Sequence, residues 1–418
     1  MTEMSKLEQL IKQHCPDGVE YKLLGEIAVR TKGTPITAAQ MKLLDKPNAP
    51  IKIFAGGKTV AYFDYSDLPE KNVNTFPSVI VKSRGVIEFE YYDKPFSHKN
   101  EMWSYHSERD DVDIKYLYYF LKTREGKLRE KATSMGAFPQ IAIPDTEQLK
   151  IPLPPLPVQQ EIVRILDNFA ELTAELTAEL TAELTARKKQ YEFYRDYLLT
   201  FDREANTILT DRQTRWVTLS EVIISLKTGL NPRKNFSLNP EGATNYYVTV
   251  REIIDGNIVF LEKTDMVDDD ALKLISKRSN LESGDVLFSG TGTIGRTAVV
   301  TETPINWGVK EGVYVIKPKQ GEIMSRYLAH ILNAGEVVRR YSKKIVGSPV
   351  ASLPMADLNR LEIPLPTLEE QARIVEILDK FDALTTDITA GLPAEIAARQ
   401  TQYEYYRDKL LTFKERIA

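Results

Sequence analysis

Hydrophobic and polar residues follow a helical period in two long segments of the chain. In residues 162–198 and again from residue 374 onward, apolar side chains recur three or four positions apart, which is typical of an amphipathic helix. The first segment predicts a helix of roughly 40 residues that begins after the proline-rich stretch 151–157, because proline cannot continue a helix. In the second segment the stretch 391–393 (GLP) predicts a break or kink. We expect helix to resume at Ala394 and to run to about Phe413.

The two helical segments are copies of one another. Residues 151–201 and 363–413 align without a gap, and roughly 30 of about 50 positions are identical, far more than chance allows. A weaker similarity relates residues 21–27 to residues 216–222. The chain is therefore predicted to be a tandem duplication. Its expected parts are a first variable block (1–150), a first spacer helix (151–205), a second variable block (206–362) and a second helical region (363–418).

Each predicted helix has an apolar stripe that needs a partner, and the duplication supplies a matching one. We therefore expect an antiparallel pair between the two copies, with the variable blocks at opposite ends. The expected fold class is α+β: two globular domains of strands and helices, separated by two long antiparallel helices and related by pseudo-twofold symmetry.

A four-residue repeat lies within the first helix. Residues 170–185 read AELTAELTAELTAELT, and Ala, Glu and Leu are strong helix formers. One unit adds about 6 Å of helix and a net rotation of about 40°, whereas one base pair of DNA advances about 3.4 Å. The tract is thus a candidate spacer on the scale of one or two base pairs. The alternative is an ordinary stable helix.

Composition adds few constraints. The 418 residues are 42% hydrophobic and 27% charged, with a net charge of −4 and a single cysteine, Cys15. These values favour two or more domains in a reduced, cytoplasmic setting, and no stretch has the length of a membrane span or the apolar core of a signal peptide. The net charge does not indicate nucleic acid, but a local basic cleft is compatible with it.

The layout resembles the DNA-specificity (S) subunit of type I restriction-modification systems. The matching features are the paired IPLP stretches, the paired endings RKKQYEFYRDYLLTF and RQTQYEYYRDKLLTF, and residues 173–184 as three TAEL units, which resemble the repeats of the family's IC branch. The resemblance implies that each variable block is a target recognition domain reading one half of a split, asymmetric site in double-stranded DNA. It also implies that the helical pair fixes the gap between the halves and binds two methyltransferase (M) subunits and, through them, the endonuclease/translocase (R) subunits.

The resemblance has further implications for chemistry. The chain itself is expected to be non-catalytic and to hold no cofactor. S-adenosylmethionine, ATP and Mg²⁺ are expected on the partner subunits, which would perform adenine-N6 methylation and ATP-dependent cleavage in phage defence. No membrane partner is expected.

Polar and glycine-rich loops of the blocks supply the candidate DNA contacts, because Lys, Arg, Ser, Thr and Asn bind phosphates or base edges. The candidates are Lys32, Thr34, Lys58, Lys82, Arg84, His98, Lys99 and Asn100 in the first block, and Arg233, Lys234, Asn235, Ser289, Thr291, Thr293, Arg296 and Lys310 in the second. Residues 134–136 and 347–348, at comparable places before the repeated segments, are secondary candidates. The alternative for each is a solvated loop.

The candidate methyltransferase dock lies on the helices, where aromatic and Arg side chains suit interface anchors. The equivalent positions are Tyr191, Tyr194 and Arg195 in the first copy and Tyr403, Tyr406 and Arg407 in the second. The alternative is that these aromatic residues pack between the helices.

Competing functions have weaker sequence support. Residues 290–297 (GTGTIGRT) nearly fit a phosphate-binding loop, but Arg296 replaces its lysine and the following residues favour a strand. A glycine-rich hairpin between strands 285–289 and 297–301 is the better interpretation, with 79–87 as its counterpart in the first block. No amino-methyltransferase motif occurs, Asp17 with Glu20 and Lys22 is too compact for a nuclease site, and the four histidines lack metal-ligand spacing. The alternatives kept are a non-DNA coiled-coil scaffold with two protein-binding modules and a nucleotide-dependent enzyme.

Overall fold

The structure, a computed structural model, describes residues 5–57, 59–135, 138–201, 214–233, 235–347, 349–386 and 391–416. The chain forms two compact units. The first contains residues 1–178 and 397–418, and the second contains residues 179–396. The units cut across the four expected segments, because each takes one part of both helical regions.

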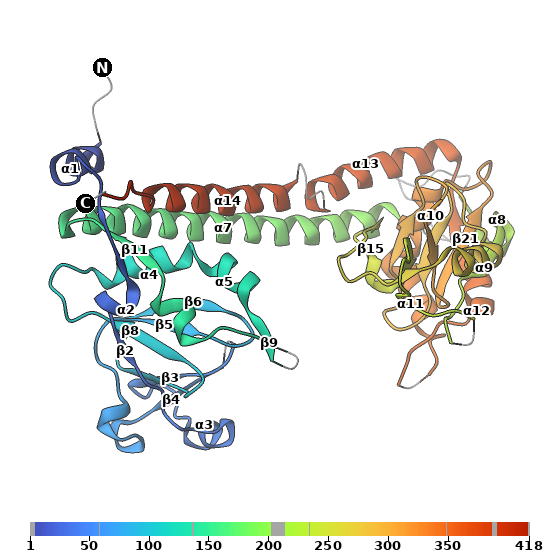
Figure 1. Cartoon of the computed structure of the whole chain (residues 1–418). Coiled ribbons are helices and arrows are strands. Elements are labelled where there is room, and N and C mark those ends of the chain that lie inside the picture. Colours follow the sequence, from blue (N-terminus) through green and yellow to red (C-terminus); the bar gives the residue numbers. More distant parts are fainter. Residues whose placement is uncertain are drawn as a thin grey trace. The chain divides into compact units, whose positions relative to one another are not determined.

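The first unit contains both helices and strands, as the predicted α+β class requires (Figure 1). Its elements are α1 (Lys6–His14), β1 (Glu20–Leu23), α2 (Leu24–Ile27), β2 (Val29–Thr31), α3 (Ala38–Leu44), β3 (Ile51–Phe54), β4 (Val60–Phe63), η1 (Tyr65–Asp67), η2 (Glu70–Asn72), β5 (Ser78–Lys82), β6 (Glu88–Tyr92), β7 (Phe96–His98), β8 (Trp103–His106), α4 (Ile114–Lys122), α5 (Glu125–Lys131), β9 (Thr133–Met135), β10 (Phe138–Gln140), α6 (Ile143–Glu147), β11 (Lys150–Leu153) and the start of α7 (Leu156–Leu198).

The second unit has a similar order of elements. They are β12 (Arg215–Thr218), α8 (Leu219–Val222), β13 (Ile223–Thr228), β14 (Asn245–Val248), η3 (Val250–Glu252), β15 (Ile253–Ile254), β16 (Asn257–Ile258), β17 (Met266–Val267), α9 (Asp269–Ser279), β18 (Val286–Ser289), β19 (Thr297–Val299), β20 (Trp307–Val309), β21 (Val313–Pro318), α10 (Ser325–Leu332), α11 (Gly335–Ser342), α12 (Met355–Asn359), β22 (Glu362–Leu365) and α13 (Leu368–Thr386). The last helix, α14 (Leu392–Leu410), returns to the first unit.

The sheets of the two units correspond strand by strand. A four-stranded antiparallel sheet has the order β2-β8-β5-β6 in the first unit and β13-β21-β18-β19 in the second. A three-stranded sheet accompanies it, β4-β3-β7 and β17-β14-β20, and its last pair is parallel in both. The pairs β1-β11 and β12-β22 lead into the spacer helices. The predicted duplication therefore extends through the variable blocks, where the sequence shows little of it.

The core of each unit lies between the four-stranded sheet and the first helix after it. In the first unit, α4 buries Tyr116, Leu117 and Phe120 against β5 and β6. The helix begins where it does because the Asp113 carboxylate accepts hydrogen bonds from the backbone N–H groups of Lys115 and Tyr116. Helix α10 takes the same place in the second unit, with Tyr327, Leu328 and Ile331 buried.

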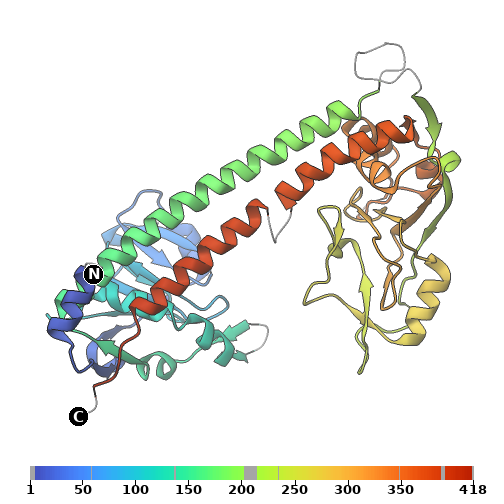
Figure 2. The ribbon, with the colours of Figure 1, turned by 90° about the horizontal axis from the view of Figure 1, so that it is seen from above.

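The spacer helices agree with the sequence prediction except at one boundary. Helix α7 runs for 43 residues, and the second helical region is divided into α13 and α14. Helix α14 begins at Leu392 and not at Ala394, because a proline is tolerated in the first turn of a helix. Within the first unit Phe169 of α7 meets Tyr406 of α14 edge to face, and within the second Tyr194 of α7 stacks on Phe381 of α13. Figure 2 shows α7 running antiparallel to α14 within the first unit and antiparallel to α13 within the second.

The AELT leucines are only partly covered. Leu172 is 54% exposed, and Leu176, Leu180 and Leu184 are half-buried. A four-residue period in a helix of 3.6 residues per turn moves each leucine by about 40°, so the tract cannot hold all of them against one partner. Among the described residues no helix has the length and apolarity to cross a membrane.

Candidate nucleic-acid interface

Four backbone segments meet at one edge of the first unit, and we call this set, Lys32–Ile36, Ser83–Ile87, His98–Met102 and Pro139–Ile141, the first loop edge. Thr34 N–H donates to the carbonyl of His98 (2.7 Å), which brings the loop after β2 to the end of β7. Gly85 N–H donates to the carbonyl of Pro139 (2.9 Å), and Ser83 Oγ bonds the Glu101 carbonyl. The β5–β6 hairpin turn is thereby fixed between the other segments.

The second unit builds an equivalent edge from Gly229–Leu230, Ser289–Arg296, Val309–Val313 and Ala351–Leu353, which we call the second loop edge. Leu230 N–H donates to the carbonyl of Val309 (3.3 Å), and Gly290 N–H donates to that of Gly312 (2.8 Å). Gly292 N–H donates to the carbonyl of Ala351 (2.8 Å). The bonding scheme repeats that of the first edge, and it makes Lys99 and Lys310 structurally equivalent residues after β7 and β20.

Two glycines permit the close approach of the loops. A Cβ atom on Gly33 would overlap the carbonyl oxygen of Lys99, and one on Gly229 would overlap that of Val309. Any side chain at these positions would push the two backbones apart. These glycines, which lie within candidate loops, therefore act by holding the loops together.

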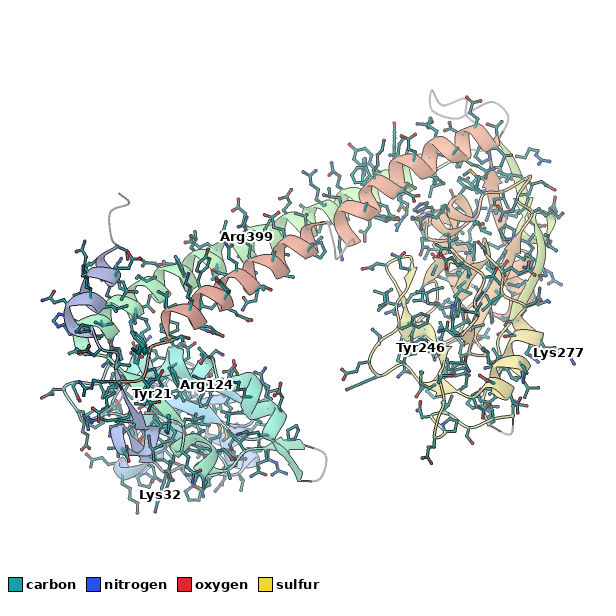
Figure 3. All side chains as sticks on the ribbon, turned by 45° about the horizontal axis from the view of Figure 1, so that its top comes forward. Tyr21, Lys32, Arg124, Tyr246, Lys277 and Arg399 are labelled. Atoms are coloured by element: carbon teal, nitrogen blue, oxygen red, sulfur yellow. The ribbon has the colours of Figure 1, made fainter. Side chains whose placement is uncertain are left out.

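Exposed cations lie on or next to both edges. Lys32 and Arg84 belong to the first, Lys310 belongs to the second, and Arg233 follows Leu230 closely. Among the described residues none of these four has an ion-pair or hydrogen-bond partner for its side chain. Lys32, labelled in Figure 3, extends from the surface of the first unit. Such side chains are available to phosphates or to base edges.

Thr34 and Lys82 are placed differently from the prediction. Thr34 is buried, with its hydroxyl 2.6 Å from that of Ser97. The Lys82 ammonium is buried between Glu90 (2.8 Å) and Glu88 (3.0 Å). Burial lowers the pKa of Lys82, but the hydrogen bonds to these carboxylates outweigh it and hold the pKa above its ordinary value. Neither side chain is available at the surface, because both sit where the strands pack.

His98 and Ser289 are also interior. His98 is fully buried, its Nε2 lies 3.2 Å from Ser104 Oγ, and burial lowers its pKa to about 4. The ring is therefore neutral near pH 7 and is no phosphate ligand. Ser289 is fully buried and closes the hairpin turn, because its hydroxyl donates to the Thr293 carbonyl and accepts from Arg296 N–H. Its role is to shape the loop.

Arg296 is exposed, but its side chain extends from the β18–β19 turn toward η3 and β15. Its guanidinium donates to the carbonyls of Val250 (3.0 Å) and Ile253 (3.2 Å) and lines a cavity of about 530 Å³. Thr291 and Lys310 line a different cavity, of about 420 Å³, at the second loop edge.

The remaining candidates divide into three groups. Thr293, Asn100 and Asn235 are exposed. Lys99 is half-buried and pairs with Glu101 at 2.8 Å. Lys58 and Lys234 lie outside the described residues, as do residues 136 and 348 of the secondary candidates.

The geometry does not favour the competing functions. Gly290–Thr297 joins the antiparallel strands β18 and β19, as the hairpin interpretation predicts, and no helix follows for a nucleotide phosphate to approach. Among the described residues His330, Asp379 and Asp382 form one group close enough for a metal ion. The Arg326 guanidinium already pairs with Asp379 (2.6 Å) and Asp382 (3.5 Å), so a cation is in place there.

Most of the candidate docking residues on the helices face the interior of their unit. Tyr191 and Tyr403 are half-buried. The Arg195 guanidinium lies over the Tyr191 ring, 5.7 Å from its centroid, and the Arg407 guanidinium lies over the Tyr403 ring at 6.0 Å. Tyr194 and Tyr406 are partly exposed and pack on the partner helix. The alternative considered for them, packing between helices, describes their contacts.

The most exposed aromatic residues lie next to these in the sequence. Phe193 (64% exposed) and Tyr405 (62%) occupy equivalent positions in the two copies. Tyr197 (51%) stacks on Phe193 with a centroid distance of 6.0 Å. Each repeat therefore presents one aromatic ring to solvent at the same place.

Two parts of the loop edges were not primary sequence candidates. Pro139–Ile141 and Ala351–Leu353 return to the hairpin turns just before the spacer helices. The small residues at 134–136 and 347–348 were the sequence signal for them.

Comparison with known proteins finds one family description twice in the chain. The family description "Type I restriction modification DNA specificity domain" matches residues 16–186 and 215–398. The chain is 32% identical over 426 aligned residues to the specificity subunit of type I restriction enzyme EcoR124I/EcoR124II of Escherichia coli, covering 99% of this chain and 98% of that one. A putative type I restriction enzyme specificity subunit of Haemophilus influenzae is 33% identical over 73% of this chain and 74% of its own length.

A solved structure of the type I R-M system, concerned with complex assembly and conformational transition, shares the fold. It aligns with a TM-score of 0.62 at 17% identity over 95% of this chain and 98% of that chain. The IC-branch assignment stays a prediction.

Proposed function

Because this chain belongs to the family of type I restriction-modification DNA specificity subunits, we propose that its two loop edges each read one half of a split site in double-stranded DNA. The chain supplies sequence specificity and is itself non-catalytic. The scaffold without DNA is the less favoured alternative.

One observation supports this placement above others. Two equivalent edges, built by the same pattern of backbone hydrogen bonds, carry exposed cations without partners among the described residues. Lys32 and Arg84 would serve the first half-site, and Arg233 and Lys310 the second, with Thr291, Thr293, Asn100 and Asn235 as polar contacts. Arg reads guanine edges well, and Lys binds phosphate as a point charge. The buried Thr34, Lys82, His98 and Ser289 are left out of this set.

Two methyltransferase subunits are the proposed partners on the helices. Phe193 and Tyr405 occupy equivalent positions and are exposed. Two copies of one partner can therefore each bind an exposed aromatic ring at the same place in the repeat. Tyr197 would add to the first of these surfaces. Phe193 and Tyr405 therefore replace Tyr191, Arg195, Tyr403 and Arg407 as the proposed docking residues, because those four side chains make contacts within their own units. The endonuclease subunits would join through this assembly.

The cofactors of the proposed reactions belong to those partners. S-adenosylmethionine would serve the methyltransferase, and ATP with Mg²⁺ the endonuclease, in the cytoplasm where the DNA lies.

A methylation map tests the reading of DNA. Cells that co-express the chain with its methyltransferase should methylate adenines in one split motif. Arg84→Ala should relax one half of that motif and Arg233→Ala the other, each by about tenfold at one position, because one good base contact contributes about 1–3 kcal/mol of discrimination.

Lys277→Ala is the matched control, since Lys277 is exposed on α9 and belongs to neither loop edge (labelled in Figure 3). It should leave the motif unchanged. A soluble complex that methylates no split motif would refute the proposed function, and a motif that both loop-edge variants leave intact would refute the assignment of the edges.

A further inference from the structure

Each recognition domain is fixed to its spacer helix by the same three polar contacts, which we call the clamp. The first contact is a buried glutamine near the start of the spacer helix. Gln159 accepts from Asp113 N–H (2.9 Å) and donates to the carbonyls of Asp111 (2.8 Å) and Pro154 (2.7 Å). Its side chain is fully buried, and two of its three hydrogen bonds reach the loop before α4.

The second unit repeats this contact atom for atom. Gln371 accepts from Met324 N–H (2.8 Å) and donates to the carbonyls of Glu322 (3.0 Å) and Pro366 (3.0 Å). It is also fully buried. A buried amide whose donors and acceptor are all matched fixes one relative position of the two backbones, since any shift would leave a polar group unpaired.

The second contact links α4 in the first unit, and α10 in the second, to the strand that precedes the spacer helix. Tyr116 of α4 donates its hydroxyl hydrogen to the carbonyl of Pro152 (2.8 Å). Tyr327 of α10 donates to that of Pro364 (3.0 Å). Both tyrosine side chains are fully buried.

The third contact is a carboxylate eight residues further along the spacer helix, about 12 Å from the glutamine at 1.5 Å per residue. Asp167 accepts from Tyr119 hydroxyl (2.6 Å) and pairs with Lys115 (2.8 Å). Asp379 pairs with Arg326 (2.6 Å) and lies 2.9 Å from His330 Nε2. Two polar contacts separated along one helix fix the direction of its axis relative to the recognition domain, whereas a single contact would not fix that direction.

We propose that Asp167 and Asp379 are positioning residues that hold each recognition domain at one angle on its spacer helix and thereby set the gap between the two DNA half-sites. They contact neither loop edge, so they act on the gap and not on the bases that are read. This inference rests on the proposed function, because it requires two half-sites read by one chain.

The duplication supplies the sharpest variant. The two clamps use different side chains, Lys115 with Tyr119 in one and Arg326 with His330 in the other, around the same carboxylate. Arg326→Lys combined with His330→Tyr rebuilds the first clamp in the second unit. This double variant should preserve the angle between the second recognition domain and its spacer helix, whereas Asp379→Ala should allow that angle to vary.

The experiment measures methylation of a plasmid library by the complex of the full chain with its methyltransferase. The library carries the two half-sites of the wild-type motif separated by the native gap and by gaps one and two base pairs shorter or longer. Asp379→Ala and Asp167→Ala should each raise the ratio of methylation at altered gaps to methylation at the native gap by about tenfold. The sequences of both halves should stay unchanged.

The controls separate positioning from folding. Glu376→Ala removes an exposed carboxylate from the same helix, where it pairs with Lys380, and should leave the ratio unchanged, as should the double variant that copies the first clamp. Equal loss of methylation at every gap after Asp379→Ala, or an unchanged ratio, would overturn the inference while leaving the proposed function in place. Failure of the wild-type chain to direct methylation to any split motif would instead remove the proposed function on which the inference depends.

Discussion

If the loop edges bind DNA as proposed, single cations set how strongly each edge attracts it. Lys310 has no ion-pair partner among the described residues, whereas its equivalent Lys99 pairs with Glu101 at 2.8 Å. A phosphate contact by Lys99 must compete with that carboxylate, so equivalent residues need not contribute equally.

Salt dependence gives a prediction for this residue. Lys310→Ala should weaken binding of duplex DNA and reduce the slope of log K against log salt concentration by about 1, the effect of losing one phosphate contact. Lys99→Ala should change the slope less. Filter binding or fluorescence anisotropy over a salt series would measure both, and an equal change in the two slopes would contradict the argument.

A buried carboxylate gives a second prediction, on pH. Glu161 on α7 accepts hydrogen bonds from Arg164 (2.7 Å) and Lys6 (2.8 Å), and these contacts lower its pKa to about 2. Because its pKa in the folded chain lies below its ordinary value, the stabilisation is complete above about pH 4.5 and is lost as the pH falls toward 2. Glu161→Gln should free α1 from α7 at neutral pH.

Hydrogen exchange in residues 6–14 would report this. Protection factors, which correct for the intrinsic pH dependence of amide exchange, should fall in wild type only in the acid range and should be low in Glu161→Gln at every pH. Glu175→Gln, at an exposed position of the same helix, serves as the control. Protection of α1 that is equal in wild type and Glu161→Gln at pH 7 would show that the ion pairs do not hold the helix.

At the scale of elements, the loop edges depend on close backbone contact. Gly229→Ala should destabilise the second unit by about 2 kcal/mol or more, because the added Cβ meets the Val309 carbonyl and the loop must move. Gly321→Ala, whose Cβ would meet no atom within 4 Å, should have little effect. Urea unfolding followed at the tryptophans would compare them, and equal midpoints would contradict the steric explanation.

The same elements show what sequence can predict. The long helix, the break at 391–393 and the β18–β19 hairpin are predictable from periodicity, proline and glycine, all of which are local signals. The burial of Lys82 and His98 depends on strands that are distant in sequence, so the polar side chains alone gave the opposite expectation. Gln159 and Gln371 look like surface residues of an amphipathic helix, and only the loops before α4 and α10 explain why they are buried.

At the scale of the whole molecule, the length of the AELT tract predicts the gap between the two DNA half-sites. Deletion of residues 174–177, one AELT unit, should shorten α7 by about 6 Å and rotate the remainder of the helix by about 40°. The methylated motif should keep both halves and change its gap by one or two base pairs. Insertion of one unit should change the gap in the opposite direction, and a gap that ignores both changes would reduce the tract to an ordinary helix.

The composition of the first unit has a consequence for synthesis. Residues 397–418 complete that unit, and among their contacts are those of Tyr406 with Phe169 and of the Phe413 carbonyl with the Tyr21 hydroxyl. A ribosome makes these residues only after it has added every residue of the second unit. The first unit is therefore finished after the second, and a transcript cut short before residue 397 yields a protein with a complete second unit and an uncovered apolar face on the first.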